Sequence, residues 1–355
     1  MERIGRPGDD FRERLSRADI ERICNSHGIR NPAKIIPEPR GNETVAYHLD
    51  DTYFLSFGVN DPTQRKVEVL RILEHIDSMP TPKVLDWSPQ DPDLHVPYMI
   101  VERCPGVRLD VLWGKCKQQD RVRLLRSLGS AMGRYHTTTL VDAKAAARTV
   151  GLDQWVVDDS KPTSLSTVES HRKQQDSLRH LSDRLKRLGL DGSSLTASLE
   201  AHYAGDRAES DAPFVGPGLI HTEPVAEHFI IERTVDTFRL SGCIDLEECA
   251  IADSFNEIVK MYVTMLALDE SYLTAFREGY EQFFPFPSDA EKRLWAGAID
   301  SDLSNTLWLL AAMATKPEWS FATHWVAAHM QRLEGWLDVR KRTDRALFRK
   351  DIGPY

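Results

Sequence analysis

Two carboxylates in the stretch between residues 219 and 263 have the setting that catalytic or metal-binding acids need. Glu223 follows a short apolar run and shares a loop with His221. A second apolar run, 229–231, comes next, and a polar turn separates it from a third run that ends at Asp245. This pattern predicts short strands joined by a hairpin, with an acid at two of the strand ends. A hairpin of this kind presents acidic groups to a metal ion or to a hydroxyl.

The first hundred residues predict a small sheet with one helix across it. Apolar positions at helical spacing predict a leading helix over 16–27 and a second helix over 62–75. Runs rich in β-branched and aromatic residues predict the strands, and Asp50-Asp51 marks a tight turn between the first two. The expected strands are 45–49, 53–57, 83–87 and 98–101.

A Pro-Gly break within residues 102–106 ends the strand pattern, and a mostly helical pattern follows. We therefore expect two lobes, 1–103 and 104–355. The apolar stripes of the second lobe are expected to be packing faces of helices rather than cofactor sites. They lie at 124–135 and 178–188, and further helices are expected over 255–268, 270–283, 289–313 and 320–339.

Composition and charge are those of an ordinary globular protein. The chain has 355 residues, of which 41% are hydrophobic and 28% charged. Its net charge of −9 disfavours a nucleic-acid partner. Its five cysteines are widely spaced without a CxxC pair, which predicts reduced thiols and argues against a structural metal site. The sequence shows neither a signal-peptide core nor an apolar run near the roughly 18 residues of a membrane span, so we expect a cytoplasmic protein with no membrane partner.

The stretch around the two carboxylates resembles the aminoglycoside phosphotransferase and choline kinase-like family, which has the protein kinase-like fold. The catalytic loop of that family reads His-Gly-Asp, four residues, then Asn, and its metal strand ends in Ile-Asp followed by Trp or Phe. A Gly-Asp-Pro segment follows the metal strand. The matching positions in this chain are His221-Thr222-Glu223, His228, Ile244-Asp245 and Asp253.

The resemblance extends over roughly residues 35 to 285. The segment 41–47 resembles the nucleotide-covering turn, and 98–102 resembles the hinge strand between the lobes. The resemblance implies an α+β, bilobal protein kinase-like fold, with a small β-rich lobe over the nucleotide and a large helical lobe carrying the catalytic and metal loops. The nucleotide-side positions that it implies are Gly41, Asn42, Thr44, Ser56, Glu68, Glu102 and Cys104.

The same resemblance implies a reaction, namely transfer of the γ-phosphate of ATP or GTP, with Mg²⁺, to a hydroxyl of a small molecule. Such a transfer needs metal-bridged phosphates and a carboxylate that orients the acceptor hydroxyl. In the family pattern Asp245 holds Mg²⁺, His228 adds a second metal contact, and Glu223 is the base. His221 belongs to the catalytic loop and is expected to brace it by hydrogen bonds. Asp253 is expected to cap or brace the following helix.

Three positions depart from the family pattern. Ser56 stands where a phosphate-binding lysine is expected, and a hydroxyl cannot supply the positive charge or pair with Glu68. Arg65 and Lys66, near the start of a predicted helix, are the basic residues available to replace that lysine.

The other two departures affect the acidic loops. Glu223 is one methylene longer than the expected aspartate, and a displacement of about 1 Å can cost about a hundredfold in rate. His228 replaces asparagine, and imidazole is a poorer ligand for Mg²⁺ than oxygen, which leaves Asp245 and Glu247 to carry the ion. A basic side chain is the alternative partner for Asp245, because a carboxylate at the end of an apolar strand needs a positive partner.

Two functions from different classes follow from these residues. In the first, the chain is a kinase-type phosphotransferase. In the second, the fold persists as a degenerate pseudokinase that binds a ligand or a protein without phosphoryl transfer, because the charge at position 56 is missing. A third possibility is a fold-sharing enzyme with other chemistry, since a fold does not determine a function. The acceptor, the choice between ATP and GTP, and the oligomeric state do not follow from the sequence.

Overall fold

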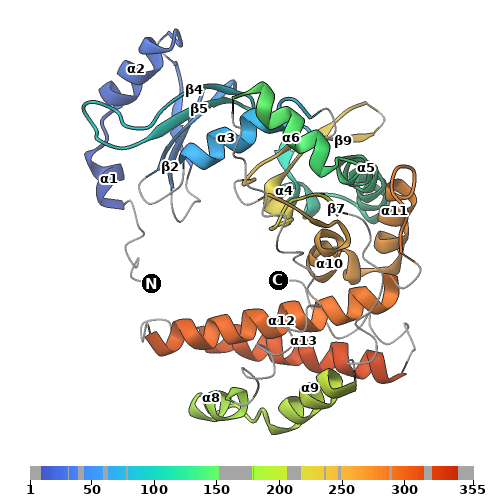
Figure 1. The fold of residues 1–355 in the computed structure, drawn as a ribbon. Helices are drawn as coiled ribbons and strands as arrows, with labels where there is room; N and C mark the ends of the chain where they lie inside the picture. Colours follow the sequence, from blue (N-terminus) through green and yellow to red (C-terminus); the bar gives the residue numbers. More distant parts are fainter. Residues whose placement is uncertain are drawn as a thin grey trace. The chain divides into compact units, whose positions relative to one another are not determined.

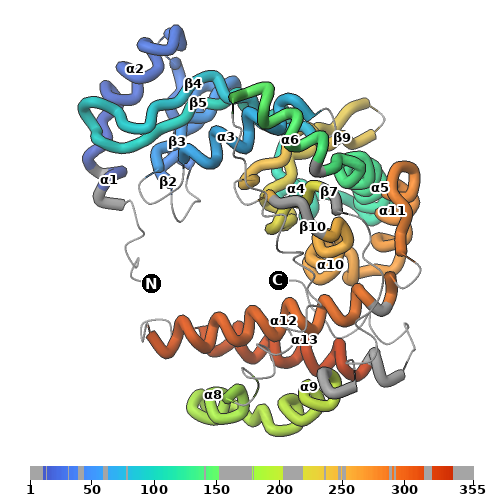
Figure 2. The backbone as a smooth tube through the Cα atoms, viewed as in Figure 1, coloured from blue at the N-terminus to red at the C-terminus, as the bar shows by residue number. Residues whose placement is uncertain are grey.

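The computed structural model divides into two compact units, which Figures 1 and 2 show element by element. Unit 1 comprises Met1–Lys115, Leu140–Val156 and Glu227–Cys249, and unit 2 comprises Cys116–Thr139, Val157–Ala226 and Ala250–Tyr355. The structure describes residues 9–30, 32–38, 44–58, 63–76, 79–151, 178, 180–205, 217–235, 237–246, 249–287, 290–315 and 322–342.

Unit 1 contains a five-stranded antiparallel sheet with the strand order β1-β2-β3-β5-β4. Alternate residues of β2, β3 and β5 pack against helices α1 and α2 in one apolar core, as the period of two in a strand requires. The strands are β1 (Ile35–Pro37), β2 (Thr44–Leu49), β3 (Tyr53–Gly58), β4 (Val84–Ser88) and β5 (Tyr98–Glu102), and the helices are α1 (Asp9–Arg14) and α2 (Arg17–Ser26).

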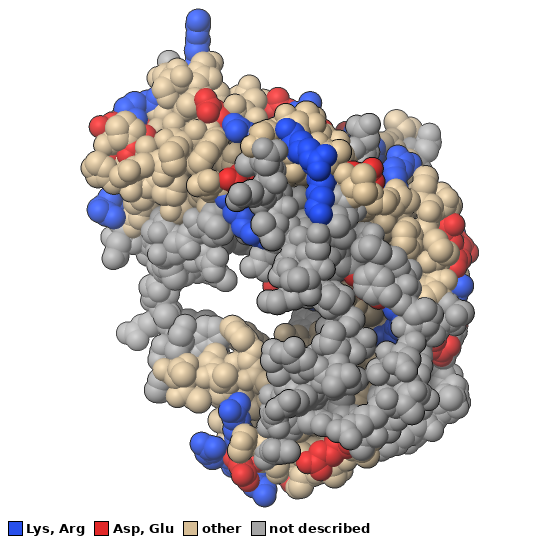
Figure 3. Space-filling model, in the orientation of Figure 1, with Lys and Arg blue, Asp and Glu red and all other residues tan. Residues whose placement is uncertain are grey.

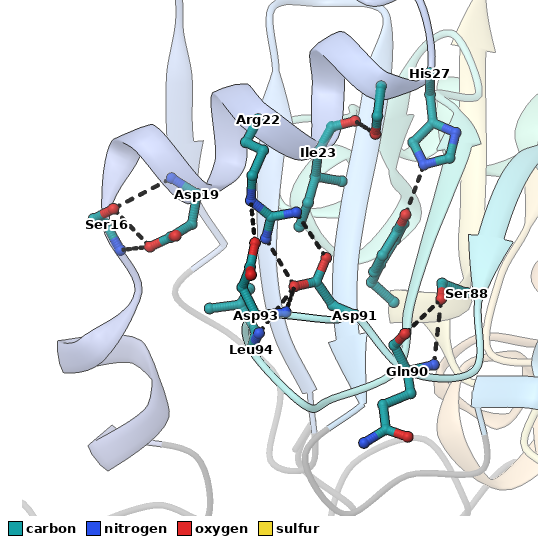
Figure 4. A network of polar contacts seen from close by, with 12 residues as sticks. Ser16, Asp19, Arg22, Ile23, His27, Ser88, Gln90, Asp91, Asp93 and Leu94 are labelled. Carbon is teal, nitrogen blue, oxygen red and sulfur yellow. Dashed lines mark hydrogen bonds and ion pairs between the residues drawn. The ribbon is translucent and has the colours of Figure 1, made fainter.

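Polar contacts add to this core and hold α2 to the sheet (Figure 4). Arg22 points to the loop after β4 and donates to the two carboxylate oxygens of Asp91 at 3.1 and 2.7 Å, while its Nε lies 3.1 Å from Asp93. His27, at the end of the helix, lies 2.7 Å from the hydroxyl of Tyr98. Burial raises the pKa of Asp91, but Arg22 together with the N–H groups of Leu94 and Asp93 lowers the pKa overall.

The chain leaves the sheet through a glycine turn and enters a second, three-stranded sheet, β6-β8-β9. Gly106 has a φ of 119°, and a Cβ at this position would meet the carbonyl of Ile231. Only glycine fits this turn without strain. The remaining elements of unit 1 are α3 (Thr63–Leu73), which packs against β4 and β5, and then β6 (Val107–Arg108), α4 (Leu109–Trp113), α6 (Leu140–Thr149), β8 (Phe229–Arg233) and β9 (Phe238–Cys243).

Unit 2 is mainly helical. Its most extensive contact between helices joins α5 (Gln118–His136) to α11 (Glu270–Tyr280). A Cβ on Gly129 would meet the carbonyl of Phe276, and a Cβ on Gly279 would meet that of Arg126. The two helix backbones therefore approach each other at positions where only glycine fits.

The other elements of unit 2 are a helical hairpin, two short strands and smaller helices. Strands β7 (Pro217–Ile220) and β10 (Ala250–Asp253) form a two-stranded antiparallel sheet. Helices α12 (Ala290–Thr315) and α13 (Thr323–Arg342) lie side by side (Figure 1). The smaller helices are α8 (Leu181–Arg187), α9 (Ser193–Gly205), α10 (Phe255–Thr264) and the 3₁₀ turn Leu266–Leu268.

A buried ion network joins α12 to α13. The carboxylate of Asp302 accepts hydrogen bonds from Nε of Arg332 at 3.1 Å and from Nε1 of Trp336 at 2.7 Å, and Nδ1 of His329 lies 2.8 Å away. Although burial raises the pKa of Asp302, these partners lower it overall. The network supplies the partners that a fully buried carboxylate requires.

The α+β fold predicted from the sequence is confirmed, with a small antiparallel sheet region and a mainly helical remainder. The predicted strands and helices are present, with ends that differ by a few residues. One local prediction is corrected: the strand before Glu223 pairs with β10, and the hairpin is formed by β8 and β9 alone. β10 and α6 were not predicted, because four and ten residues without a clear apolar period carry little signal. The lobe boundary at 103/104 stays a prediction.

Charged side chains of both signs are interspersed on the face that Figure 3 shows. Among the described residues, no helix has the length and apolar character needed to cross a bilayer.

Candidate active site

The β8–β9 hairpin of unit 1 brings two predicted site residues together. His228 directly precedes β8, and Asp245 stands two residues beyond β9. The strands pair Phe229 with Cys243, and the N–H of Ile244 donates to the carbonyl of His228 at 2.9 Å. As a result, Nε2 of His228 lies 3.3 Å from Oδ2 of Asp245.

The backbone of Asp245 is held in an uncommon conformation. Its φ is 63°, in the left-handed region that non-glycine residues enter at an energetic cost. Its side chain is 43% exposed, so the carboxylate is accessible to solvent. Strained backbone at a carboxylate with basic neighbours is frequent at functional sites.

A lysine from helix α3 approaches the same carboxylate. Nζ of Lys66 lies 3.9 Å from Oδ1 of Asp245, and the lysine side chain is only 14% exposed. Both oxygens of Asp245 therefore face a basic group, Lys66 on one side and His228 on the other. The positive partner expected for a carboxylate at a strand end is present within unit 1.

The predicted position of the phosphate-binding lysine lies in the centre of the five-stranded sheet. Ser56 belongs to β3, pairs with Ala46 and Met99, and is 4% exposed. Glu68 on α3, expected to face that position, accepts a hydrogen bond from Nε2 of Gln64 at 2.8 Å. The glutamate is thus engaged by a side chain of its own helix.

Of the remaining nucleotide-side positions, Thr44, Glu102 and Cys104 lie at or just beyond the ends of strands. Thr44 begins β2 opposite Gly58. Glu102 ends β5, where its N–H donates to the carbonyl of Lys83 at 2.8 Å. Burial raises the pKa of the Cys104 thiol to about 11, which suits a packing residue. The predicted positions Gly41 and Asn42 lie outside the described residues.

Unit 2 carries the predicted catalytic loop, directly after β7. His221 is 1% exposed, and its Nδ1 accepts the N–H of Glu223 at 3.2 Å, so this histidine braces the loop. Glu223 itself is exposed. The ammonium group of Lys260 on α10 donates to the carbonyl of Thr222 and holds the loop from the other side.

A buried glutamate anchors this loop to the helical core. Oε2 of Glu257 on α10 accepts the N–H of His221 at 2.9 Å and lies 2.9 Å from Nε2 of His136 on α5. Nδ1 of His136 lies 2.7 Å from the hydroxyl of Tyr280 on α11. Burial raises the pKa of Glu257, and the contact with His136 acts in the opposite direction. Three helices therefore converge on the start of the predicted catalytic loop.

Asp253, at the end of β10, braces the start of α10. One of its carboxylate oxygens accepts a hydrogen bond from the N–H of Phe255 at 3.0 Å, and the other accepts one from the guanidinium group of Arg293 at 3.0 Å. This buried carboxylate is engaged on both sides by protein groups, as its expected bracing role requires.

The comparisons with known proteins identify the family. The model of a phosphotransferase enzyme family matches residues 34–295, more than half of the chain. The chain belongs to this phosphotransferase family. A comparison with curated proteins finds no significant match.

Solved structures of other phosphotransferases have the same fold. The GDP complex of wild-type aminoglycoside 2'-phosphotransferase-IIIa is 14% identical, with a TM-score of 0.61, and the match covers 90% of this chain and 97% of that one. The GDP and kanamycin complex of APH(2")-IIIa is 16% identical, with a TM-score of 0.60 and coverages of 88% and 96%. The streptomycin–ATP–APH(2")-IIa ternary complex is 15% identical, with a TM-score of 0.55 and coverages of 83% and 91%. At these identities the likeness establishes the fold.

The donor groups of this phosphotransferase suit Mg²⁺ that shares its coordination with phosphate. Among the residues described, no group of three or more His, Cys, Asp or Glu is arranged to hold a metal. Asp245 offers carboxylate oxygens, which Mg²⁺ prefers, and His228 offers a less suitable nitrogen. One or two carboxylates together with substrate phosphates are the usual Mg²⁺ ligands in such sites.

Glu257, the residue that anchors the predicted catalytic loop, was not identified from the sequence. Glu257 follows Phe255-Asn256 in an apolar helix, and its burial against His136 joins residues 121 positions apart. A glutamate on the apolar face of the helix predicted over 255–268 was the signal available. This signal did not identify His136 as the partner of Glu257.

Proposed function

We propose that this chain transfers the γ-phosphate of ATP or GTP, bound with Mg²⁺, to a hydroxyl of a small molecule. The observation that supports the proposal most is the meeting of His228 and Asp245 at the base of the β8–β9 hairpin, with Lys66 beside them. In a member of a phosphotransferase family, such a cluster of one carboxylate and two basic groups suits the binding of a metal-bridged phosphate.

Asp245 is the residue that holds Mg²⁺ in this proposal, and His228 adds a second contact or orients the carboxylate. The metal ion, when bound, neutralises charge on the transferring phosphate. Asp245 has a left-handed backbone at the end of the hairpin, and 43% of its side chain is open to an incoming ligand. Phosphoryl transfer requires this kind of positioning more than covalent help from the protein.

Glu223 is the proposed base, which orients the acceptor hydroxyl and takes its proton. Its side chain is exposed, while the loop that carries it is held by His221, Lys260 and Glu257. A rigid backbone under an accessible carboxylate suits general-base catalysis. His221 acts on the loop and not on the substrate.

The nucleotide is proposed to contact the sheet of unit 1. The supporting features are the end of β5 at Glu102 and the start of β2 at Thr44, and the solved phosphotransferases with the same fold include complexes with GDP and with ATP. The residues proposed on this side are Gly41, Asn42, Thr44, Ser56, Glu68, Glu102 and Cys104.

The acceptor is proposed to be a hydroxyl-bearing small molecule. Kanamycin and streptomycin are present in complexes of the solved phosphotransferases with the same fold, which makes aminoglycosides the first compounds to test. A cytoplasmic location is proposed with this function, since the five cysteines are free thiols.

The pseudokinase remains the second candidate, and one observation favours it. Ser56 supplies no charge, and Glu68, its expected partner, is bonded to Gln64. A pseudokinase would keep the fold to bind another ligand or a protein and would not turn over a nucleotide.

Nucleotide turnover separates the two functions. Release of ADP or GDP should be followed with Mg²⁺-ATP and Mg²⁺-GTP against a panel of aminoglycosides, amino alcohols and sugars, and the product should be checked by mass spectrometry. We expect acceptor-dependent release and a mass gain of one phosphoryl group. Nucleotide that binds without any acceptor-dependent release across the panel would support the pseudokinase instead.

A further inference from the structure

Lys66 occupies a position on α3 that an apolar residue would normally fill. It lies three residues after Thr63, four before Leu70 and seven before Leu73, so these four residues form one stripe of the helix. The other three are 3%, 7% and 1% exposed. The stripe faces the interior of unit 1, and Lys66 is the charged member of it.

The opposite stripe of α3 is polar. Gln64, Glu68 and Arg71 follow the same helical spacing, and Gln64 and Arg71 are exposed. Glu68 bonds to Gln64 along this stripe. The charge of Lys66 is therefore placed inward, and the charge of Arg71 outward, on the same helix.

The inward charge meets Asp245, on the strand-end loop predicted to hold the metal ion. Nζ of Lys66 and Oδ1 of Asp245 are 3.9 Å apart. Arginines of unit 1 that form ion pairs among the described residues have other partners: Arg17 with Glu21, Arg22 with Asp91, Arg103 with Asp51, Arg108 with Asp110 and Arg239 with Glu232. A long, flexible ammonium side chain that is 14% exposed can reach a phosphate oxygen without leaving its helix.

We propose that Lys66 supplies from helix α3 the phosphate-binding charge that position 56 of the sheet lacks. In the nucleotide-free protein its ammonium group rests near Asp245, and with nucleotide bound it contacts a phosphate oxygen beside that carboxylate. This inference rests on the proposed function, since it assumes that a nucleoside triphosphate binds at Asp245. It explains how the chain can hold a triphosphate although Ser56 carries no charge and Glu68 is engaged by Gln64.

The alternative role for Lys66 is structural, and the two roles predict opposite effects on stability. If Lys66 serves the ligand, Lys66→Met removes a charge from an otherwise uncharged, buried stripe and adds packing, so the melting temperature without nucleotide should stay the same or rise. If the contact with Asp245 serves the fold, the same change should lower it.

The test measures two quantities on the full chain. Dissociation constants for Mg²⁺-ATP and Mg²⁺-GTP come from titration calorimetry, and melting temperatures come from scans without nucleotide. Lys66→Met should weaken nucleotide binding about ten- to a hundredfold, the effect of one charge-assisted hydrogen bond, without lowering the melting temperature. Lys66→Arg keeps the charge, and its dissociation constants should stay within a few-fold of those of the wild-type protein. Arg71→Met, which removes an equal charge from the outer stripe, should have no effect.

Two results would overturn the inference while the proposed function stands: unchanged nucleotide affinity in Lys66→Met, or an equal loss in Arg71→Met. A lower melting temperature without loss of affinity would assign Lys66 to the fold. If Lys66→Met does not fold, Lys66→Gln replaces it, because glutamine is polar but uncharged. The same loss of nucleotide affinity, without a lower melting temperature, is then expected of Lys66→Gln. If the unchanged protein binds neither nucleotide, the proposed function itself fails, and the inference fails with it.

Discussion

At the scale of single residues, the candidate acids are held in different ways. Asp245 has basic neighbours on both carboxylate oxygens, Lys66 at 3.9 Å and His228 at 3.3 Å, and it is half-exposed. Glu223 stands exposed on a loop whose backbone is fixed by His221. The first arrangement suits the binding of a cation or a phosphate, and the second suits proton transfer to an acceptor that arrives from solvent.

Substitution of Glu223 tests its role as the base. Glu223→Gln should lower kcat by about 10² to 10⁴, and Glu223→Asp, which keeps the carboxylate but shortens its reach, by about a hundredfold at most. The melting temperature should not change, because the side chain is exposed. Steady-state kinetics with a saturating acceptor measure the effect. Glu291→Gln, at an exposed position of α12, is the control, and equal rates for Glu223→Gln and this control would remove Glu223 from catalysis.

Sequence patterns identified the candidate site residues, but they gave less information about the contacts that these residues make. His228 and Asp245 were identified from motif spacing, and the hairpin brings them into contact. Lys66 was named with Arg65 as a substitute for the missing lysine, and its place in the stripe Thr63, Lys66, Leu70 would have favoured Lys66, because that stripe points inward. The partner of a buried charge depends on tertiary packing, which the local pattern does not specify.

At the scale of elements, the crossing of α5 and α11 supports the catalytic loop. His136 of α5 and Tyr280 of α11 form the network that ends at Glu257 and the N–H of His221. Glycines allow this close approach, and the sequence showed only apolar stripes there. Gly129 and Gly279 carry no apolar signal, so the contact could not be predicted from helical periodicity.

The methyl group of an alanine at position 279 should disturb the close contact between α5 and α11. Gly279→Ala places a Cβ 2.8 Å from the backbone nitrogen of Ser130 and closer still to the carbonyl of Arg126. We expect a loss of about 1–3 kcal/mol in the free energy of unfolding, measured by urea denaturation. Gly114→Ala is the matched control, because nothing lies within 4 Å of its Cβ and its φ is −63°. That change should be neutral or stabilise by about 0.4–1 kcal/mol. Equal effects of the two changes would contradict the close crossing.

The ion network between α12 and α13 predicts a pH-dependent stability. The partners of Asp302 lower its pKa below the unfolded value, so their contribution is full above about pH 4 and is lost as pH falls through the lowered pKa. Asp302→Asn should therefore cost about 3–5 kcal/mol of unfolding free energy at pH 7. The difference from the unchanged protein should shrink as the pH drops below 4. Urea denaturation at a series of pH values measures it, and a constant difference would contradict a charged Asp302.

At the scale of the whole molecule, the fold could be predicted because many ordered features agree across the chain. Matches from the nucleotide-covering turn to the segment after the metal strand indicated the family, and the family model covers residues 34–295. The activity was harder to predict, since it depends on a phosphate-binding charge that is absent at Ser56 and that we propose Lys66 supplies. Motif matching registers the loss at Ser56, whereas only the packing of α3 reveals the lysine that faces Asp245.

The most direct test of the account is the thermal shift of the protein with Mg²⁺-nucleotide. We expect Mg²⁺-ATP or Mg²⁺-GTP to raise the melting temperature, by an amount equivalent to about 2.7 kcal/mol at a hundredfold excess over Kd. The shift should shrink when EDTA removes Mg²⁺, and it should be lost in Asp245→Asn, whose amide is a weaker ligand for the cation. A flat melting temperature with both nucleotides, or a full shift in Asp245→Asn, would contradict a Mg²⁺-nucleotide site at Asp245.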